Sequence, residues 1–217
     1  MKFYWIKTNA LIKRIYAKYI WDIPTDKKKV YLTFDDGPTP EVTKWTLAQL
    51  KTHHAKATFF CIGDNIKKYP EIFQEAIKQG HAIGNHTFNH LNGWKTSTKD
   101  YIENCISCSK IIVKTQNCES STQFPKLFRP PYGKIKSGQA NKLMRMGYKI
   151  IMWDILSADF DQAISPEKCL ENVLSNIKSG SIIVFHDSVK SFKNLEHALP
   201  KTLDFINKNG YTCHVLL

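Results

Sequence analysis

Short apolar runs alternate with longer amphipathic stretches along most of this 217-residue chain. The apolar runs have the length of buried strands, and the stretches between them repeat their apolar residues at helical spacing. Such alternation favours a parallel sheet with crossover helices. We predict strands over residues 30–34, 57–62, 82–84, 126–128, 148–153, 181–185 and 211–215. We predict helices over residues 40–50, 65–79, 99–113, 139–146, 167–178 and 195–209.

Residues 30–217 read as a single α/β domain, because neither a linker nor an internal repeat divides them. The number of strands and the chain length fit a small β/α barrel better than an open sheet. The alternation alone does not decide whether the sheet closes.

Residues 1–29 form a separate N-terminal segment that carries half of the net charge of +12. Eight lysines and arginines, among them Lys13, Arg14 and Lys18, stand there against two aspartates. The pattern predicts a basic amphipathic helix, which either packs against the barrel or lies on an anionic membrane surface. Its apolar positions are Leu11, Ile12, Ile15, Tyr16, Tyr19 and Ile20.

The apolar runs of this segment, such as residues 3–6, are too short for a signal-peptide core or a membrane span. We therefore expect a cytoplasmic or peripherally membrane-associated protein. Its six cysteines are then expected to be free thiols. Cys105 and Cys108 lie among apolar residues at helical spacing, which favours a helix over a metal or redox site.

Outside the N-terminal segment, the lysines are scattered along the chain. Scattered lysines are typical of a solvated surface, whereas a nucleic-acid groove needs a clustered basic patch. We therefore predict no nucleic-acid partner.

Two adjacent carboxylates, Asp35 and Asp36, end the first apolar strand and are followed by Gly37-Pro38. Neighbouring carboxylates repel, so a fold holds such a pair mainly where a cation or an arginine gives each a separate partner. Active sites of α/β folds collect at the carboxyl ends of strands. The alternative interpretation is a solvated turn.

His86 and His90 follow the third predicted strand at a spacing of four residues. On one helical turn, this spacing lets both imidazoles reach a single metal ion. Together with one carboxylate they offer two nitrogens and one oxygen, which leaves coordination positions open for catalysis.

Arg129 precedes two prolines at the end of the fourth predicted strand and is one of only three arginines in the chain. A guanidinium can hold a carboxylate in its ionised form. The prolines, the second of which is Pro131, remove two amide donors, so the amide of Tyr132 becomes a donor that can face a ligand. A surface arginine before a rigid loop is the alternative.

Two further strand ends carry polar groups. Residues 153–160 offer acidic and aromatic side chains, among them Asp159 and Phe160. His186 follows an apolar strand and has a carboxylate neighbour in sequence, which suits a titrating acid.

Taken together, the motifs Thr33–Pro38, His86–His90 and Arg129–Gly133 with the two later strand ends resemble the polysaccharide deacetylases of carbohydrate esterase family four. This family includes chitin, chitooligosaccharide and peptidoglycan N-deacetylases, which usually act on envelope or extracellular polymers. The resemblance covers residues 30–217 and implies a distorted, incompletely closed (β/α)7 barrel as the catalytic domain. It implies a hydrolase that removes N-linked acetyl groups from N-acetylglucosamine-type amino sugars.

The resemblance also implies roles for single residues. Asp36, His86 and His90 would bind a divalent metal, most commonly zinc, with cobalt or nickel as alternatives. Asp35, held by Arg129, would be the general base that activates a metal-bound water. His186, supported by Asp159, would be the general acid. The substrate and its oxyanion would meet Tyr132, Pro131, Trp94 and Phe160.

The fourth motif departs from the family pattern, because Leu156 replaces an aspartate and Phe160 replaces a tryptophan. Asp159 is retained, so the support of His186 is expected to remain. The altered wall leaves the glycan substrate open, and Trp94 is either a sugar platform or a packing residue for its loop. The alternative function is a metal-containing glycan-binding protein with little or no turnover. The sequence does not predict an oligomeric state.

Overall fold

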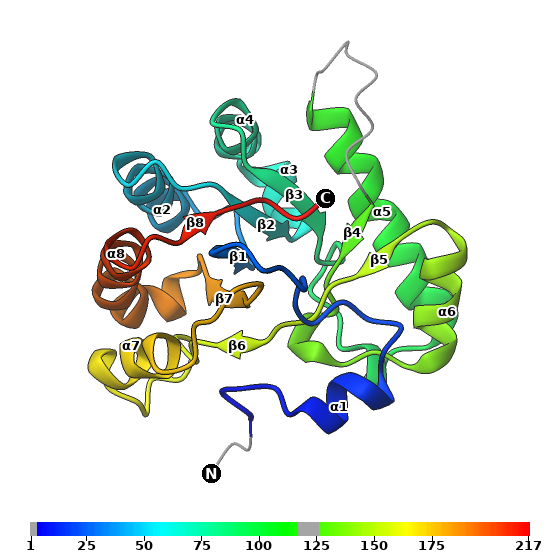
Figure 1. Cartoon of the computed structure of the whole chain (residues 1–217). Coiled ribbons are helices and arrows are strands. Elements are labelled where there is room, and N and C mark those ends of the chain that lie inside the picture. The colour runs from blue at the N-terminus through cyan, green and yellow to red at the C-terminus, as the bar shows by residue number, and fades with distance from the viewer. Residues whose placement is uncertain (1–3, 117–125) are drawn as a thin grey trace.

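A curled sheet of eight parallel strands forms an incomplete barrel, and helices cover its outer face (Figure 1). The computed structural model describes residues 4–116 and 126–217. Residues 1–3 of the N-terminal segment and Cys118 lie outside the described residues. The strands are β1 (Lys29–Asp35), β2 (Ala57–Cys61), β3 (Ala82–Asn85), β4 (Leu127–Phe128), β5 (Lys149–Ile150), β6 (Ile155–Leu156), β7 (Ile182–His186) and β8 (Thr212–Cys213).

The helices follow the strands in the predicted alternation. They are α1 (Ala10–Ile15), α2 (Pro40–Thr52), α3 (Gly63–Lys68), α4 (Pro70–Lys78), α5 (Thr98–Gln116), α6 (Ser137–Arg145), α7 (Pro166–Leu174) and α8 (Phe192–Lys208). Short 3₁₀ turns lie at η1 (Gly93–Lys95), η2 (Pro131–Gly133) and η3 (Val189–Ser191).

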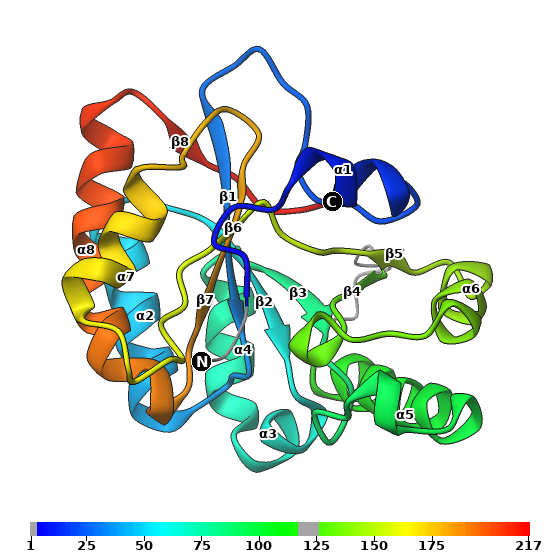
Figure 2. The ribbon, with the colours of Figure 1, turned by 90° about the horizontal axis from the view of Figure 1, so that it is seen from below.

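The strand order is β5-β4-β3-β2-β1-β7-β6, with β8 added beside the start of β1. β5 and β6 are the two ends of this path, so the described sheet stops short of a closed ring. The N-terminal segment lies along this seam: Ile20 bridges Ile151, and Lys7 bridges Ile155 (Figure 2). The distorted, incompletely closed α/β barrel predicted from the sequence is confirmed.

The barrel core is apolar and is shared between the sheet and its outer helices. Alternate residues of β1, β2 and β7 pack against α2, α7 and α8 in the largest cluster of buried side chains. Within it, the ring of Phe34 stacks between Phe59 and Phe185, at centroid distances of 5.1 and 6.1 Å. This packing fixes the strands whose carboxyl ends carry the polar motifs.

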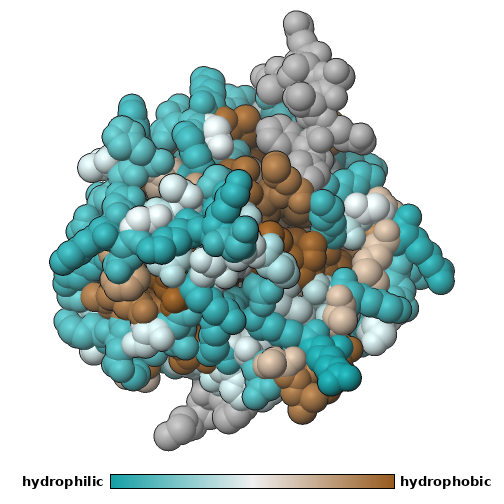
Figure 3. All heavy atoms as spheres, viewed as in Figure 1, coloured by the Kyte–Doolittle hydropathy of each residue, from teal (hydrophilic) through white to brown (hydrophobic). Residues whose placement is uncertain are grey.

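The predicted N-terminal helix is shorter than its apolar pattern suggested. α1 spans only Ala10–Ile15, and the indole of Trp21 donates to the carbonyl of Tyr16, where the helix has ended (3.1 Å). Ile12 and Tyr19 pack against the barrel, whereas Leu11 is 62% exposed. Ile15 and Tyr16 are exposed beside it, and Figure 3 shows apolar side chains in this place at the lower edge of the molecule.

Two further predicted elements differ in the structure, and one strand is additional. The helix predicted over 65–79 is divided into α3 and α4 at Tyr69-Pro70, because proline disfavours a helical conformation of the residue before it. The strand predicted over 148–153 is reduced to β5, and β6 was not predicted. The amide of Ile151 instead donates to the carbonyl of Phe128 in β4, and the amide of Met152 donates to the carbonyl of Ile20 in the N-terminal segment.

None of the described helices is both long enough and apolar enough to cross a membrane. The described cysteines are free thiols, as predicted. Cys105 and Cys108 are buried in α5, which confirms the helical interpretation of this pair.

Candidate active site

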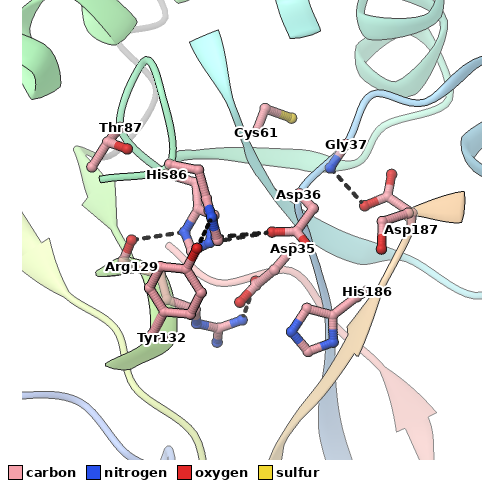
Figure 4. A network of polar contacts seen from close by, with 12 residues as sticks. Asp35, Asp36, Gly37, Cys61, His86, Thr87, Arg129, Tyr132, His186 and Asp187 are labelled. Carbon is pink, nitrogen blue, oxygen red and sulfur yellow. Dashed lines mark hydrogen bonds and ion pairs between the residues drawn. The ribbon is translucent and has the colours of Figure 1, made fainter. Parts of the chain in front are cut away.

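The side chains of the sequence motifs gather at the carboxyl ends of the strands (Figure 4). Asp35 is the last residue of β1, and its register partner across the sheet is His186, the last residue of β7. The buried, parallel pairing of β1 with β2 and β7 places the Asp-Asp turn between the histidine motif and His186. The strand ends are thus brought together as predicted.

Arg129 is fully buried, and its guanidinium is fixed by several acceptors. Nη1 donates to Asp35 Oδ1 and to Thr33 Oγ1, both at 2.7 Å. Nε and Nη2 donate to the carbonyls of Ile151 and Met152, and the group lies 4.2 Å from the centre of the Phe60 ring. Asp35 therefore has an immobile cation as its partner.

Asp36 faces a different pair of groups. Its Oδ1 lies 3.2 Å from His90 Nε2 and 3.7 Å from His86 Nε2. This oxygen is buried without a hydrogen bond among the described residues. Burial would raise the pKa of Asp36, but the imidazoles of His90, His186 and His86 outweigh that effect and hold it well below its ordinary value.

His86 is held as a neutral imidazole. Its Nδ1 donates to the carbonyl of Arg129 at 2.8 Å, so the lone pair lies on Nε2, toward Asp36. Burial lowers the pKa of His86 to about 4, against the opposing effect of Asp35. Arg129 thus orients His86 through its backbone and Asp35 through its side chain.

His90 completes a group of three ligand atoms that lie within 4.8 Å of one another, together with Asp36 and His86. The Nδ1 atom of His90 lies 3.1 Å from the hydroxyl of Tyr132, and the two rings meet edge to face. Two imidazole nitrogens and one carboxylate oxygen suit a divalent transition metal, and the orphaned Asp36 oxygen fits the same conclusion.

Several site residues have backbone conformations that residues other than glycine rarely adopt. Asp36 has φ 84°, and its carbonyl accepts from Asn65 Nδ2 at 2.7 Å. The remaining positive φ angles in or beside the site belong to Thr87 (63°), His90 (55°), Tyr132 (61°) and Ala158 (62°). The surrounding contacts therefore impose the direction in which these groups point.

Asp187 was not predicted as a site residue. Its carboxylate accepts from the Gly37 amide (3.0 Å) and from Thr43 Oγ1 (2.6 Å), so it holds the turn after Asp36. A Cβ at Gly37 would lie 2.0 Å from Asp187 Oδ2, which is why glycine is required there. Burial raises the pKa of Asp187 to about 7. The neighbour of His186 in sequence is therefore not its hydrogen-bond partner.

The partner of His186 is Asp159, which is fully buried. Its Oδ1 lies 2.7 Å from His186 Nδ1, and its Oδ2 accepts from the His186 amide at 2.6 Å. Burial alone would lower the pKa of His186, but Asp159, with the charges of Asp36 and Asp35, raises it to about 9. His186 is therefore cationic at neutral pH.

The remaining predicted contact residues have different surroundings. Tyr132 is 60% exposed in η2, directly after the buried Pro131. Phe160 packs edge to face against His186 at 5.1 Å, whereas Leu156 is buried in β6. Trp94 is 61% exposed, and its indole donates to the carbonyl of Ile135, in the loop that follows η2.

Asp154, another acidic group of the fourth motif, faces away from this centre. It is fully buried and pairs with Lys7, Lys13 and Ser181 Oγ. It therefore ties the N-terminal segment to the barrel.

Comparison with known proteins agrees with this geometry. A family model described as polysaccharide deacetylase matches residues 22–151. A peptidoglycan-N-acetylglucosamine deacetylase of Bacillus cereus is 35% identical over 193 residues, which cover 88% of this chain and 87% of the relative. A chitooligosaccharide deacetylase of Azorhizobium caulinodans is 36% identical over 165 residues, 76% of each chain. The crystal structure of a peptidoglycan N-acetylglucosamine deacetylase superposes with a TM-score of 0.85 at 32% identity, covering 96% of this chain and 95% of that one.

Proposed function

The chain belongs to the polysaccharide deacetylase family and is a hydrolase of that family, and from this premise we propose a specific reaction for it. It removes N-linked acetyl groups from amino sugars of a peptidoglycan-type glycan by a metal-dependent mechanism. One observation carries the proposal. The two adjacent carboxylates have different partners, since Arg129 holds Asp35 while Asp36 faces His86 and His90. This division suits a general base beside a metal ligand.

Asp36, His86 and His90 would hold the metal, and the nitrogen-rich donor set favours zinc, with cobalt and nickel as alternatives. The bound cation supplies a Lewis acid that polarises the amide carbonyl and acidifies water. The neutral state of His86 and the ionised state of Asp36 are the protonation states that ligation needs.

Asp35 would accept the proton of the attacking water. The ion pair with Arg129 (2.7 Å) fixes the carboxylate in place. The oxygen that becomes negatively charged in the transition state would meet the amide of Tyr132. That amide lies in the first turn of η2, where amides have no acceptor within the helix.

His186 would donate a proton to the leaving amine. It is cationic at neutral pH, and the carboxylate of Asp159 orients its ring. Phe160, Tyr132, Pro131 and Trp94 would contact the sugar around this centre.

An acetate-release assay tests the proposed function. Purified protein is treated with chelator, reloaded with zinc, cobalt or nickel, and given peptidoglycan and N-acetylated chitooligosaccharides. We expect release that the chelator abolishes and one of the metals restores. Saturable glycan binding without release from any substrate would favour the alternative, a glycan-binding protein with little turnover.

The cellular location rests on the sequence. We propose a cytoplasmic or peripherally membrane-associated protein that acts on an N-acetylated glycan. The exposed Leu11, Ile15 and Tyr16 of the α1 region, beside basic residues, support the membrane contact. Cell fractionation tests this proposal, because electrostatic attachment to a membrane is released by high salt. Recovery of the protein outside the cell would contradict it.

A further inference from the structure

The N-terminal segment extends the sheet beside β6 and reaches the rim of the site. The amide of Leu156 donates to the carbonyl of Ile6 at 2.8 Å, and the amide of Thr8 donates to the carbonyl of Asp154 at 2.9 Å. Lys7 Nζ adds an ion pair with Asp154 at 2.6 Å. These contacts place Tyr4 next to the loop that follows β6.

Tyr4 contacts two neighbouring residues of that loop. Its hydroxyl donates to Asp161 Oδ2 at 2.9 Å. Its ring meets Phe160 edge to face, at a centroid distance of 5.5 Å and an interplanar angle of 67°. Burial and the hydrogen bond to Asp161 raise the pKa of Tyr4 to about 12, so the hydroxyl remains a donor. The hydrogen bond to Asp161 holds Tyr4 in place, and the Tyr4 ring then packs against Phe160.

Phe160 makes its other ring contact with His186, at 5.1 Å and 76°. The imidazole does not depend on Phe160 for its direction, because Asp159 holds both Nδ1 and the backbone amide of His186. Movement of Phe160 would therefore change the wall beside His186 and leave the acid in place.

We propose that Tyr4 is a positioning residue that holds Phe160 as a wall of the substrate pocket beside His186. The inference rests on the proposed deacetylase function. It adds a residue that determines specificity, and this residue lies in the N-terminal segment, outside the motifs at the strand ends. Substrates that fill the space next to Phe160 are the ones whose binding depends on Tyr4.

Steady-state kinetics on an N-acetylated oligosaccharide tests the proposal. In Tyr4→Ala we expect KM to rise about three- to tenfold, which is the fold-change that corresponds to the loss of one aromatic contact. We expect kcat to stay within about twofold of the wild type. Tyr4→Phe keeps the ring on Phe160 and loses only the bond to Asp161, so a smaller rise is expected. The alkaline limb of the pH profile should not move in either variant, because the pair of His186 and Asp159 is intact.

Tyr16→Ala is the matched control, since this tyrosine of the same segment stacks on Tyr19 and does not contact the site loop. Its KM should equal that of the wild type. An unchanged KM in Tyr4→Ala, or an equal rise in Tyr16→Ala, would overturn the role of Tyr4 while leaving the deacetylase function intact. A kcat loss with a lower melting temperature and unchanged KM would also overturn it, because that result shows a general structural role. Failure of the wild type to release acetate would instead contradict the proposed function.

Discussion

Asp35 and Asp36 are neighbours in sequence, but each faces a different partner. The side chain of Asp35 meets the buried guanidinium of Arg129, and that of Asp36 meets two imidazoles. Asp36 has φ 84°, a backbone conformation that residues other than glycine rarely adopt. The repulsion between the two adjacent carboxylates is thus offset, because each of them has an attractive neighbour of its own.

The pair of His186 and Asp159 leads to a prediction about pH. The raised pKa of His186, about 9, means that the acid is protonated below that pH and is lost as pH rises through it. In Asp159→Asn the supporting charge is absent, so the pKa falls. We expect the alkaline limb of kcat/KM to move to lower pH, measured from pH 5 to 10.

Asp204→Asn is the control for this shift, because Asp204 contacts His53 at 3.2 Å on the surface, away from the site. Its profile should match the wild type. An Asp159→Asn profile with an unmoved alkaline limb would show that His186 is not the acid that this limb reports.

The sequence was sufficient to predict residues whose role follows from their own motif. Asp36, His86 and His90 lie together as predicted. The helical turn from which the spacing of the two histidines was interpreted is absent, however, because residues 86–90 form a bend with positive φ at Thr87 and His90. Asp187 was missed because its function depends on Gly37 and Thr43, which are distant in sequence. The one available signal was its position beside His186, and that signal suggested the wrong partner.

At the scale of elements, the N-terminal segment covers the seam between β5 and β6, and Asp154 holds the segment there. This buried carboxylate pairs with Lys7 and Lys13 and accepts from Ser181. In Asp154→Asn the shape of the side chain is kept, but Lys7 loses the carboxylate with which it pairs and Lys13 keeps only its pair with Asp22. We expect a loss of about 2 kcal/mol in the free energy of unfolding, measured with urea at neutral pH, since the lysines are partly solvated.

Asp64→Asn is the matched control, because Asp64 forms an exposed pair with Lys68 on α3. Its unfolding midpoint should not change measurably. The pKa of Asp154 is held below its ordinary value despite burial, so its contribution is present above the unfolded pKa and is lost as pH falls. Equal midpoints for the wild type and Asp154→Asn would contradict this account.

β6 and the short α1 could not be predicted from sequence for a physical reason. Ile155 and Leu156 make a two-residue strand whose partners are β7 and the N-terminal segment, far away in the chain. The apolar pattern after Ile15 is helical in spacing, but Ile20 is used to bridge Ile151. Long-range pairing thus overrode local periodicity.

At the scale of the whole molecule, metal binding should stabilise the fold. A ligand that binds only the folded state, at a concentration of about 100 times its Kd, adds about 2.7 kcal/mol to the free energy of unfolding. For a chain of this size we expect zinc to raise the melting temperature of chelator-treated protein by roughly 5–10 °C. His90→Gln should lose most of this shift.

His197→Gln is the control for the metal effect, because His197 lies on α8 and is not part of the proposed metal site of Asp36, His86 and His90. It should retain the full shift. A zinc-induced rise that is equal in His90→Gln and His197→Gln would place the metal elsewhere.

The division of labour between the two aspartates is the central claim, and one paired measurement tests it. Metal content and acetate release are determined on the same samples of wild type, Asp35→Asn and Asp36→Asn. We predict that Asp35→Asn binds one metal ion per chain, as the wild type does, and loses turnover by about 10²–10⁴-fold, the usual contribution of a general base. Asp36→Asn should lose both metal and turnover. Loss of metal in Asp35→Asn, or full metal content in Asp36→Asn, would contradict the assignment.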